Sequence, residues 1–309
     1  MKTLEIDHPD KNHPLFDFES AKKLYDGMAI GGELVSSPFD IYSNETLRDR
    51  YGFREEKPSV KTDVMLFSRG TPPKKYLTQI GGMPYGAGTF DWPKRKGKPM
   101  PFFAQFSFLD SLGLFADLPG HLLLIFADES VVREEYSVEC YCDEQDCFKF
   151  IWLVRDEKAD REPTPEPSQE MPIAMKEPWY GVLHRTVDYP AISKTCNMRL
   201  DEDKKVSSFF LPILNATKIR GVPHFIQGNP GKLEDGSQVK KLLFLCQLSS
   251  IQAAPDVPFP WCNCAKKMIL DFGENGIYGA KNQLSMFDMG NIYFFMKPNG
   301  RIVWHFDCY

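Results

Sequence analysis

The sequence lacks the short motifs by which many nucleotide-dependent and metal-dependent enzymes are recognised. It contains no Gly-x-Gly-x-x-Gly or Gly-x-x-x-x-Gly-Lys-Ser/Thr phosphate loop and no His-Glu-x-x-His zinc motif. Its six histidines are scattered, and its acidic residues show no paired-carboxylate spacing. These absences argue against an enzyme of a familiar class, so we expect a protein that acts by binding and assign no catalytic residue.

The sequence is also poor in features that direct a chain to a membrane or to nucleic acid. No segment approaches the roughly 18 apolar residues of a membrane span, and no basic region followed by an apolar one marks an export signal. The net charge of −5 disfavours a phosphate-binding surface, because such surfaces gather Lys and Arg. The one basic run, at 94–98, is expected to be a solvated hairpin tip. We therefore expect a soluble, cytoplasmic protein without a membrane or nucleic-acid partner.

Without an export signal, the eight cysteines favour free thiols or metal ligands over disulfides. The pairs Cys140-x-Cys142 and Cys262-x-Cys264 are one residue shorter than the usual zinc knuckle, and Cys147 lies across a predicted turn. Two interpretations stay open. Either these five cysteines contribute to a zinc site, or they are buried thiols that pack as small apolar side chains. Apart from zinc, no cofactor is expected.

The composition that is present favours strands and turns. Aromatic residues make up 13 % of the chain, which is typical of strand-rich proteins, and 24 Pro and 22 Gly supply many turns. Hydrophobic residues at 42 % and charged residues at 26 % are ordinary for a soluble globular protein.

A seven-residue segment occurs twice, and the two copies predict an internal duplication. Residues 78–84 read Thr-Gln-Ile-Gly-Gly-Met-Pro, and residues 217–223 read Thr-Lys-Ile-Arg-Gly-Val-Pro. Two further blocks follow in the same order, since 103–107 resembles 245–249 and 120–126 resembles 290–295. Repeated blocks in conserved order indicate repeated supersecondary units.

We predict a mainly β fold (β-rich α+β), internally duplicated, with two pseudo-symmetric antiparallel-sheet lobes and few short helices. Apolar and β-branched runs predict strands at 60–67, 100–108, 121–127, 290–296 and 301–306, a hairpin of 136–142 with 147–154, and a short helix at 19–26. The expected division is an N-terminal helical and strand region (1–75) that packs on the first lobe, a first β lobe (76–155), a Pro-rich and charged linker or loop (156–178) and a second β lobe (179–309). One compact domain overall is the alternative.

Four residues are candidate binding residues: Gly81, Trp92, Gln105 and Gln247. Paired glycines at 81–82 permit positive φ or close approach of a ligand, but Arg220 replaces Gly81 in the second copy, so the shared feature is the turn. A glutamine inside an apolar strand needs hydrogen-bond partners. Its recurrence in both copies suggests that the amide ties the turn to the strand, and contact with a ligand is the alternative.

These motifs together resemble the YwqG-like family of uncharacterised bacterial proteins. The resemblance rests on the Thr-x-Ile-Gly-Gly-x-Pro turn, Trp92-Pro93, the Phe-x-x-Gln strand at 102–105, a Leu-Pro-Gly turn and the segment 288–295. It implies a duplicated β-rich fold with no established reaction, and a link to toxin and immunity genes that suggests binding of a protein partner.

A more distant likeness is to the programmed-cell-death-protein-two family, which chaperones a ribosomal protein. Its Gly-Gly-x-Pro and Phe-Leu-x-Gln segments resemble 81–84 and 244–247. The zinc-binding cysteines of that family do not carry over, because no Cys pair lies between 84 and 105.

The leading functional hypothesis is therefore a protein-interaction module, immunity-like or chaperone-like, with an unidentified partner. The alternatives are a zinc-binding protein or metal-dependent enzyme that uses the Cys clusters, and a small-ligand pocket between the lobes. The sequence leaves the oligomeric state open.

Overall fold

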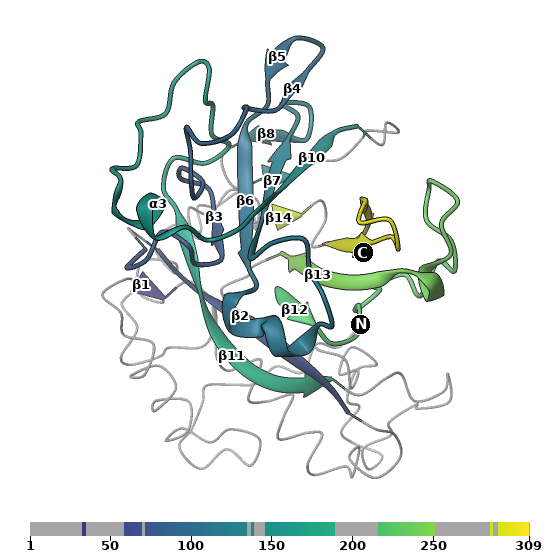
Figure 1. Cartoon of the computed structure of the whole chain (residues 1–309). Coiled ribbons are helices and arrows are strands. Elements are labelled where there is room, and N and C mark those ends of the chain that lie inside the picture. The colour runs from purple at the N-terminus through teal and green to yellow at the C-terminus, as the bar shows by residue number, and fades with distance from the viewer. Residues whose placement is uncertain are drawn as a thin grey trace, which may run out of the picture.

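The structure, a computed structural model, describes residues 33–34, 59–69, 72–134, 137–138, 146–188, 216–250, 285–286 and 290–308 (Figure 1). Within them the fold is β-rich, with mainly antiparallel pairing and little helix, which confirms the predicted fold class. No helix of this part of the chain is long and apolar enough to cross a membrane.

The elements follow the chain in this order. The strands are β1 (Glu33–Leu34), β2 (Val60–Arg69), β3 (Gln79–Ile80), β4 (Lys94–Arg95), β5 (Lys98–Pro99), β6 (Phe102–Ser107), β7 (Leu122–Ala127), β8 (Val132–Glu134), β9 (Ser137–Val138), β10 (Phe148–Leu153), β11 (Trp179–Asp188), β12 (Lys218–Arg220), β13 (Leu243–Ser249), β14 (Ser285–Met286), β15 (Asn291–Met296) and β16 (Ile302–Asp307). The helical segments are η1 (Leu109–Leu114), α3 (Glu157–Arg161) and η2 (Val239–Lys241).

One large sheet contains most of these strands, in the order β10-β7-β6-β3-β11-β2-β12-β13-β15-β16, with β1 also pairing β2. At its centre β2 and β11 pair antiparallel over all ten residues of each strand. The halves that we predicted as two lobes are joined by backbone hydrogen bonds in one continuous sheet.

The two halves of the sheet have matching arrangements on either side of this central pair. Strands β3, β6, β7 and β10 follow one another on one side, and β12, β13, β15 and β16 do so on the other. Both β6 and β13 carry an irregularity in their pairing, at Phe102/Ala104 and at Phe244/Cys246. The matching order is what a duplicated unit would produce, and the duplication itself stays a prediction.

The two ends of the sheet pack against each other through aromatic side chains. The ring of Phe148 on β10 lies 4.9 Å from that of Trp304 on β16, centroid to centroid, and Phe106 on β6 lies 6.3 Å from Phe294 on β15. The main core therefore lies between the arms of a folded sheet. Burial of these aromatic and aliphatic side chains is the dominant stabilising contribution.

The structure confirms several predicted strands and shows which strands pair with them. Residues 60–67 lie in β2, whose neighbours β11 and β12 both follow the Pro-rich segment in the chain. The predicted hairpin of 136–142 with 147–154 is wrong for the described residues, because β10 pairs β7, whereas β9 pairs β8 and β14 in a separate three-stranded sheet. The basic run at 94–98 does form a small hairpin, β4 with β5. The helix expected at 19–26 lies outside the described residues.

The segment 156–178, expected as a mobile linker or loop, contains the short helix α3 and continues as a loop whose end is held against the first half. The backbone N–H of Phe102 donates to the carbonyl of Pro172, and that of Ala174 donates to the carbonyl of Phe102, both at 2.8 Å. Met175 is buried in the main core. The apolar residues between the charged part and β11 explain this packing, because leaving them in water would be unfavourable.

Candidate functional site

The first repeated turn approaches another part of the same chain closely. Gly81 and Gly82 have φ values of +70° and +64°, a conformation that side chains disfavour. A Cβ atom on Gly81 would lie 2.7 Å from Cβ of Met175, and the N–H of Gly82 donates to the Met175 carbonyl at 2.8 Å. In the structure Gly81, a candidate binding residue, therefore accommodates the chain itself.

Gln105 uses its buried amide to hold this turn. Its Oε1 accepts from the backbone N–H of Tyr85 at 2.8 Å, and its Nε2 donates to the carbonyls of Lys75 and Leu77 at 2.8 and 2.6 Å. Ser107 adds a backbone donation to Oγ1 of Thr78. These bonds support the structural interpretation of Gln105 over contact with a ligand.

The second turn repeats these bonds position by position. The Oε1 atom of Gln247 accepts from the N–H of His224 at 2.9 Å, its Nε2 donates to the carbonyl of Ala216 at 3.2 Å, and Ser249 donates to Oγ1 of Thr217. Arg220 takes the place of Gly81 and keeps a positive φ of +62°. The turn conformation is thus retained even where the residue is not glycine.

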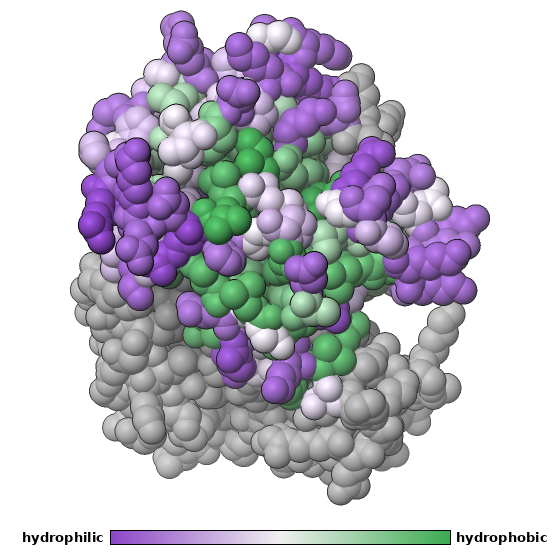
Figure 2. All heavy atoms as spheres, in the orientation of Figure 1, coloured by the Kyte–Doolittle hydropathy of each residue, from purple (hydrophilic) through white to green (hydrophobic). Residues whose placement is uncertain are grey.

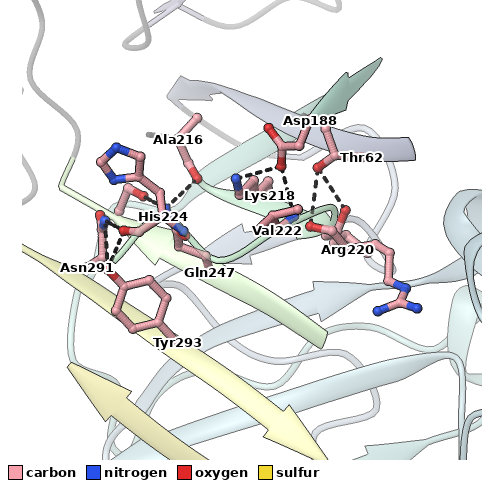
Figure 3. Close-up of polar contacts among 12 residues, drawn as sticks. Thr62, Asp188, Ala216, Lys218, Arg220, Val222, His224, Gln247, Asn291 and Tyr293 are labelled. Atoms are coloured by element: carbon pink, nitrogen blue, oxygen red, sulfur yellow. Dashed lines mark hydrogen bonds and ion pairs between the residues drawn. The ribbon is translucent and has the colours of Figure 1, made fainter. Parts of the chain in front are cut away.

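A buried ion pair distinguishes the second turn from the first (Figure 3). Nζ of Lys218 lies 2.8 Å from Oδ2 of Asp188, and both side chains are fully buried. The same carboxylate oxygen accepts from the N–H of Val222 at 3.0 Å. In the first turn the corresponding residue is Gln79, whose Nε2 donates to the carbonyls of Gly81 and Met83. Each turn therefore has its own internal polar anchor.

His224 lies beside this ion pair and is uncharged. Its ring points away from the backbone bond to Gln247 (Figure 3), and neither ring nitrogen has a hydrogen-bond partner in the described part of the chain. Burial, with a smaller contribution from the charge of Lys218, lowers the pKa of His224 to about 4. The imidazole of His224 is therefore neutral at neutral pH, and no carboxylate or hydroxyl of the described residues is bonded to it.

The backbone of His224 is held by a second group of buried polar side chains. Its carbonyl accepts from Nδ2 of Asn291, and the Tyr293 hydroxyl lies within hydrogen-bond distance of that carbonyl and of the Asp307 carboxylate. Burial raises the pKa values of both Tyr293 and Asp307. The second turn is therefore a tightly bonded structural unit.

Trp92, the fourth candidate binding residue, packs on the other face of the sheet. Its Nε1 donates to the carbonyl of Met100 at 2.8 Å, and its ring makes an edge contact with Phe126 at 5.1 Å. Trp92 thus closes a satellite hydrophobic cluster over β6 and β7.

The cysteine prediction is only partly covered by the structure. Cys147 is buried and packs in the main core. Cys140, Cys142, Cys262 and Cys264 lie outside the described residues, and no group that could hold a metal occurs among the residues that are described. The zinc interpretation stays a prediction.

A groove of about 920 Å³ lies beside the first turn. Gln79, Gly82, Met83 and Pro84 of the turn contribute to its wall. The rest of its lining is Pro72, Pro73, Lys74, Lys75, Tyr76, Arg155, Asp160, Thr164, Pro165, Glu166, Pro167, Ile173, Lys176 and Pro178. We call this the first-turn groove. Its volume is near the upper end of the range for ligand pockets.

The first-turn groove is positively charged although the chain is acidic. Lys74, Lys75, Arg155 and Lys176 outnumber Asp160 and Glu166 in its lining. Arg155 is fixed there, because its guanidinium lies 3.9 Å from the centre of the Tyr76 ring and 2.7 Å from Oδ2 of Asp160.

The positive charge of two lysines in the groove is available to a ligand. Lys74 and Lys176 are exposed and form no ion pair with any described residue. The groove can therefore bind acidic groups.

Sequence reasoning pointed to the turn but missed the groove beside it. Tyr76, Arg155 and Lys176 lie far apart in the sequence and belong to no motif. The available signal was the density of proline in 72–73 and 163–167, of which we interpreted only the second as linker composition. Proline also stiffens the wall of a binding site.

The chain belongs to the family described as Domain of unknown function (DUF1963), whose model matches residues 78–308. The match begins at the first repeated turn and ends in the last residues of the C-terminal half. No curated protein matches the chain. The family description assigns no activity.

Proposed function

We propose that this DUF1963 protein is a non-enzymatic interaction module that binds an extended, acidic segment of a partner protein in the first-turn groove. The observation that carries the proposal is a positively charged groove in a protein of net charge −5. A cleft with an excess of positive charge raises the local concentration of acidic ligands and favours them over basic ones.

The groove has the rigidity that peptide binding requires. Six prolines line it, and its floor includes the turn that Gln79 and Gln105 hold by hydrogen bonds. A wall that is already ordered loses little conformational entropy on binding, so more of the interaction energy remains as affinity.

Tyr76 and Arg155 offer a defined contact within the groove. The stacked guanidinium and ring present a flat surface, and the ion pair with Asp160 keeps the guanidinium in place. Apolar and aromatic side chains of a peptide can pack on such a surface, while Lys74 and Lys176 contact its carboxylates.

The resemblance to the YwqG-like proteins supports a protein partner as the ligand. An immunity-like or chaperone-like role is one form of this proposal, since both require recognition of another chain without chemistry on it.

A peptide array tests the proposal directly. The array pairs extended, proline-containing sequences that differ only in whether their charged positions hold Asp or Lys. We expect the Asp members to bind the wild type and to lose binding to the Lys176→Glu variant, with Lys240→Glu as the matched exposed control outside the groove. Equal binding of both peptide sets, or none by either, would contradict the proposal.

A further inference from the structure

The two outermost strands of the large sheet, β10 and β16, line one cavity of about 320 Å³. Alternate residues of each strand contribute to its walls: Phe148, Phe150 and Trp152 of β10, and Ile302 and Trp304 of β16. Both ends of the sheet therefore border the same space. We call this space the end-strand cavity.

The hydrogen bonds of β10 show which of its main-chain groups point away from the sheet. In an antiparallel pair, one residue directs its N–H and C=O toward one side of the strand, and the next residue directs both toward the other side. The N–H of Asp128 donates to the carbonyl of Cys147 at 2.8 Å, so the main-chain groups of Cys147 face β7. Those of Phe148, Phe150 and Trp152 therefore point to the outer edge of β10.

The same alternation applies to β16. The N–H of Lys297 donates to the carbonyl of Arg301 at 2.9 Å, so the main-chain groups of Arg301 face β15. Those of Ile302 and Trp304 therefore point to the outer edge of β16. The described part of the chain places no strand beside either edge. The residues that line the cavity are thus the ones whose main-chain donors and acceptors have no strand to pair with there.

We infer that the end-strand cavity receives an extended segment of a partner protein, which adds to the sheet as a strand antiparallel to β10. A row of main-chain donors and acceptors with the spacing of a strand is matched by another strand, and proteins commonly bind peptides by adding them to a sheet edge. The rings of Phe148 and Trp304 contact each other at 4.9 Å and narrow one end of the cavity. The new strand is therefore expected to pair mainly with Phe150 and Trp152.

The side chains around the cavity define the chemistry of this segment. Opposite residues of an antiparallel pair place their side chains on the same face, so residues opposite Phe150 and Trp152 meet aromatic rings that pack on the main core. Lys149 lies on the other face of β10, 3.7 Å from Asp146, and Arg301 is exposed and forms no ion pair with any residue that the structure describes. Alternating apolar and acidic residues therefore fit the site best. Such a segment also suits the surface in Figure 2, where apolar side chains over β6 and β13 are surrounded by polar ones.

A short fluorescein-labelled peptide of alternating Val and Glu tests this inference on the full chain, with fluorescence anisotropy as the readout. The control peptide has the same composition, with all Val residues before all Glu residues, so its charge is equal and its alternation is lost. We expect saturable binding of the alternating peptide, and binding of the control that is weaker by about tenfold or more. No saturation by the alternating peptide, or equal affinity for both, would overturn the inference.

Methylation of the peptide nitrogens tests whether the main chain makes the contact. When the Val side chains face Phe150 and Trp152, the Val N–H groups donate to β10 and the Glu N–H groups point away from it. We expect N-methylation at the Val positions to abolish saturable binding, and N-methylation at the Glu positions to leave it within about twofold of the parent peptide. Equal weakening by both would overturn the pairing with β10.

Two matched variants of the protein locate the site. Arg301→Glu is expected to weaken binding of the alternating peptide by about fivefold, whereas Arg161→Glu, exposed on α3 and outside the cavity, leaves it nearly unchanged. Wild-type affinity in Arg301→Glu, with a melting curve that shows a folded protein, would overturn the placement. Lys176→Glu in the first-turn groove is expected to leave this binding intact, so the two binding proposals can fail separately.

Discussion

Gly81 and Gly231 have nearly the same backbone conformation but different surroundings. Their φ values are +70° and +72°, yet a Cβ on Gly81 would meet Met175 at 2.7 Å, and one on Gly231 would meet nothing within 4 Å. We expect Gly231→Ala to cost about 1 kcal/mol of unfolding free energy from backbone strain alone. Gly81→Ala adds overpacking of about 1–3 kcal/mol. Urea unfolding measures the loss of unfolding free energy in both variants. Equal losses would refute the role of Gly81 in allowing the close approach of Met175.

His224 predicts a specific loss of stability in acid. Its pKa is about 4 in the folded chain and 6.5 when unfolded, so only the unfolded state gains a proton as the pH falls between these values. Stability is therefore complete above pH 6.5 and declines toward pH 4, by about 3 kcal/mol in total. The measurement is the unfolding free energy against pH for the wild type and for His224→Phe. An identical slope in the variant would show that other groups cause the decline.

The turn elements depend on their buried anchors, and Lys218 is the strongest test of that dependence. Lys218→Met leaves the buried Asp188 carboxylate without its ion-pair partner, which is expected to cost about 3–5 kcal/mol. The exposed control Lys240→Met is expected to change stability by less than about 0.5 kcal/mol. Denaturant unfolding of both variants measures the difference. Similar small losses would mean that the ion pair does not stabilise the second turn.

The elements also show what the sequence could and could not predict. Apolar runs predicted β7 and β15, because β7 is buried along its whole length and β15 over all but its last residue. The recurrence of glutamine predicted the ties made by Gln105 and Gln247, since a buried amide must find partners.

The pairing of strands that lie far apart in the chain left no such signal in the sequence. Strand β11 was missed because Gly181 and Arg185 interrupt its apolar pattern; Arg185 in turn pairs with the buried Asp63 of β2 at 2.8 Å. Its ten-residue pairing with β2 depends on contacts more than a hundred residues apart. The first-turn groove went unpredicted for the same reason, since its walls come from separate loops.

For the whole molecule, the continuous sheet predicts that the two halves unfold together. Separating them would break the central pairing of β2 with β11 and the aromatic contacts between β10 and β16. Calorimetry is expected to show one transition whose calorimetric and van't Hoff enthalpies agree. Two resolved transitions would instead favour two independent lobes.

The affinity of one acidic peptide for matched charge-reversal variants tests the central claim most directly. The first variant carries Lys74→Glu with Lys176→Glu in the first-turn groove, and the second carries Lys240→Glu with Lys241→Glu on η2, which leaves the net charge equal. The proposed peptide site predicts that the groove variant binds at least about tenfold more weakly than the wild type, while the η2 variant binds nearly as well. Equal loss in both variants would show that only overall charge matters, and would contradict a peptide site in the groove.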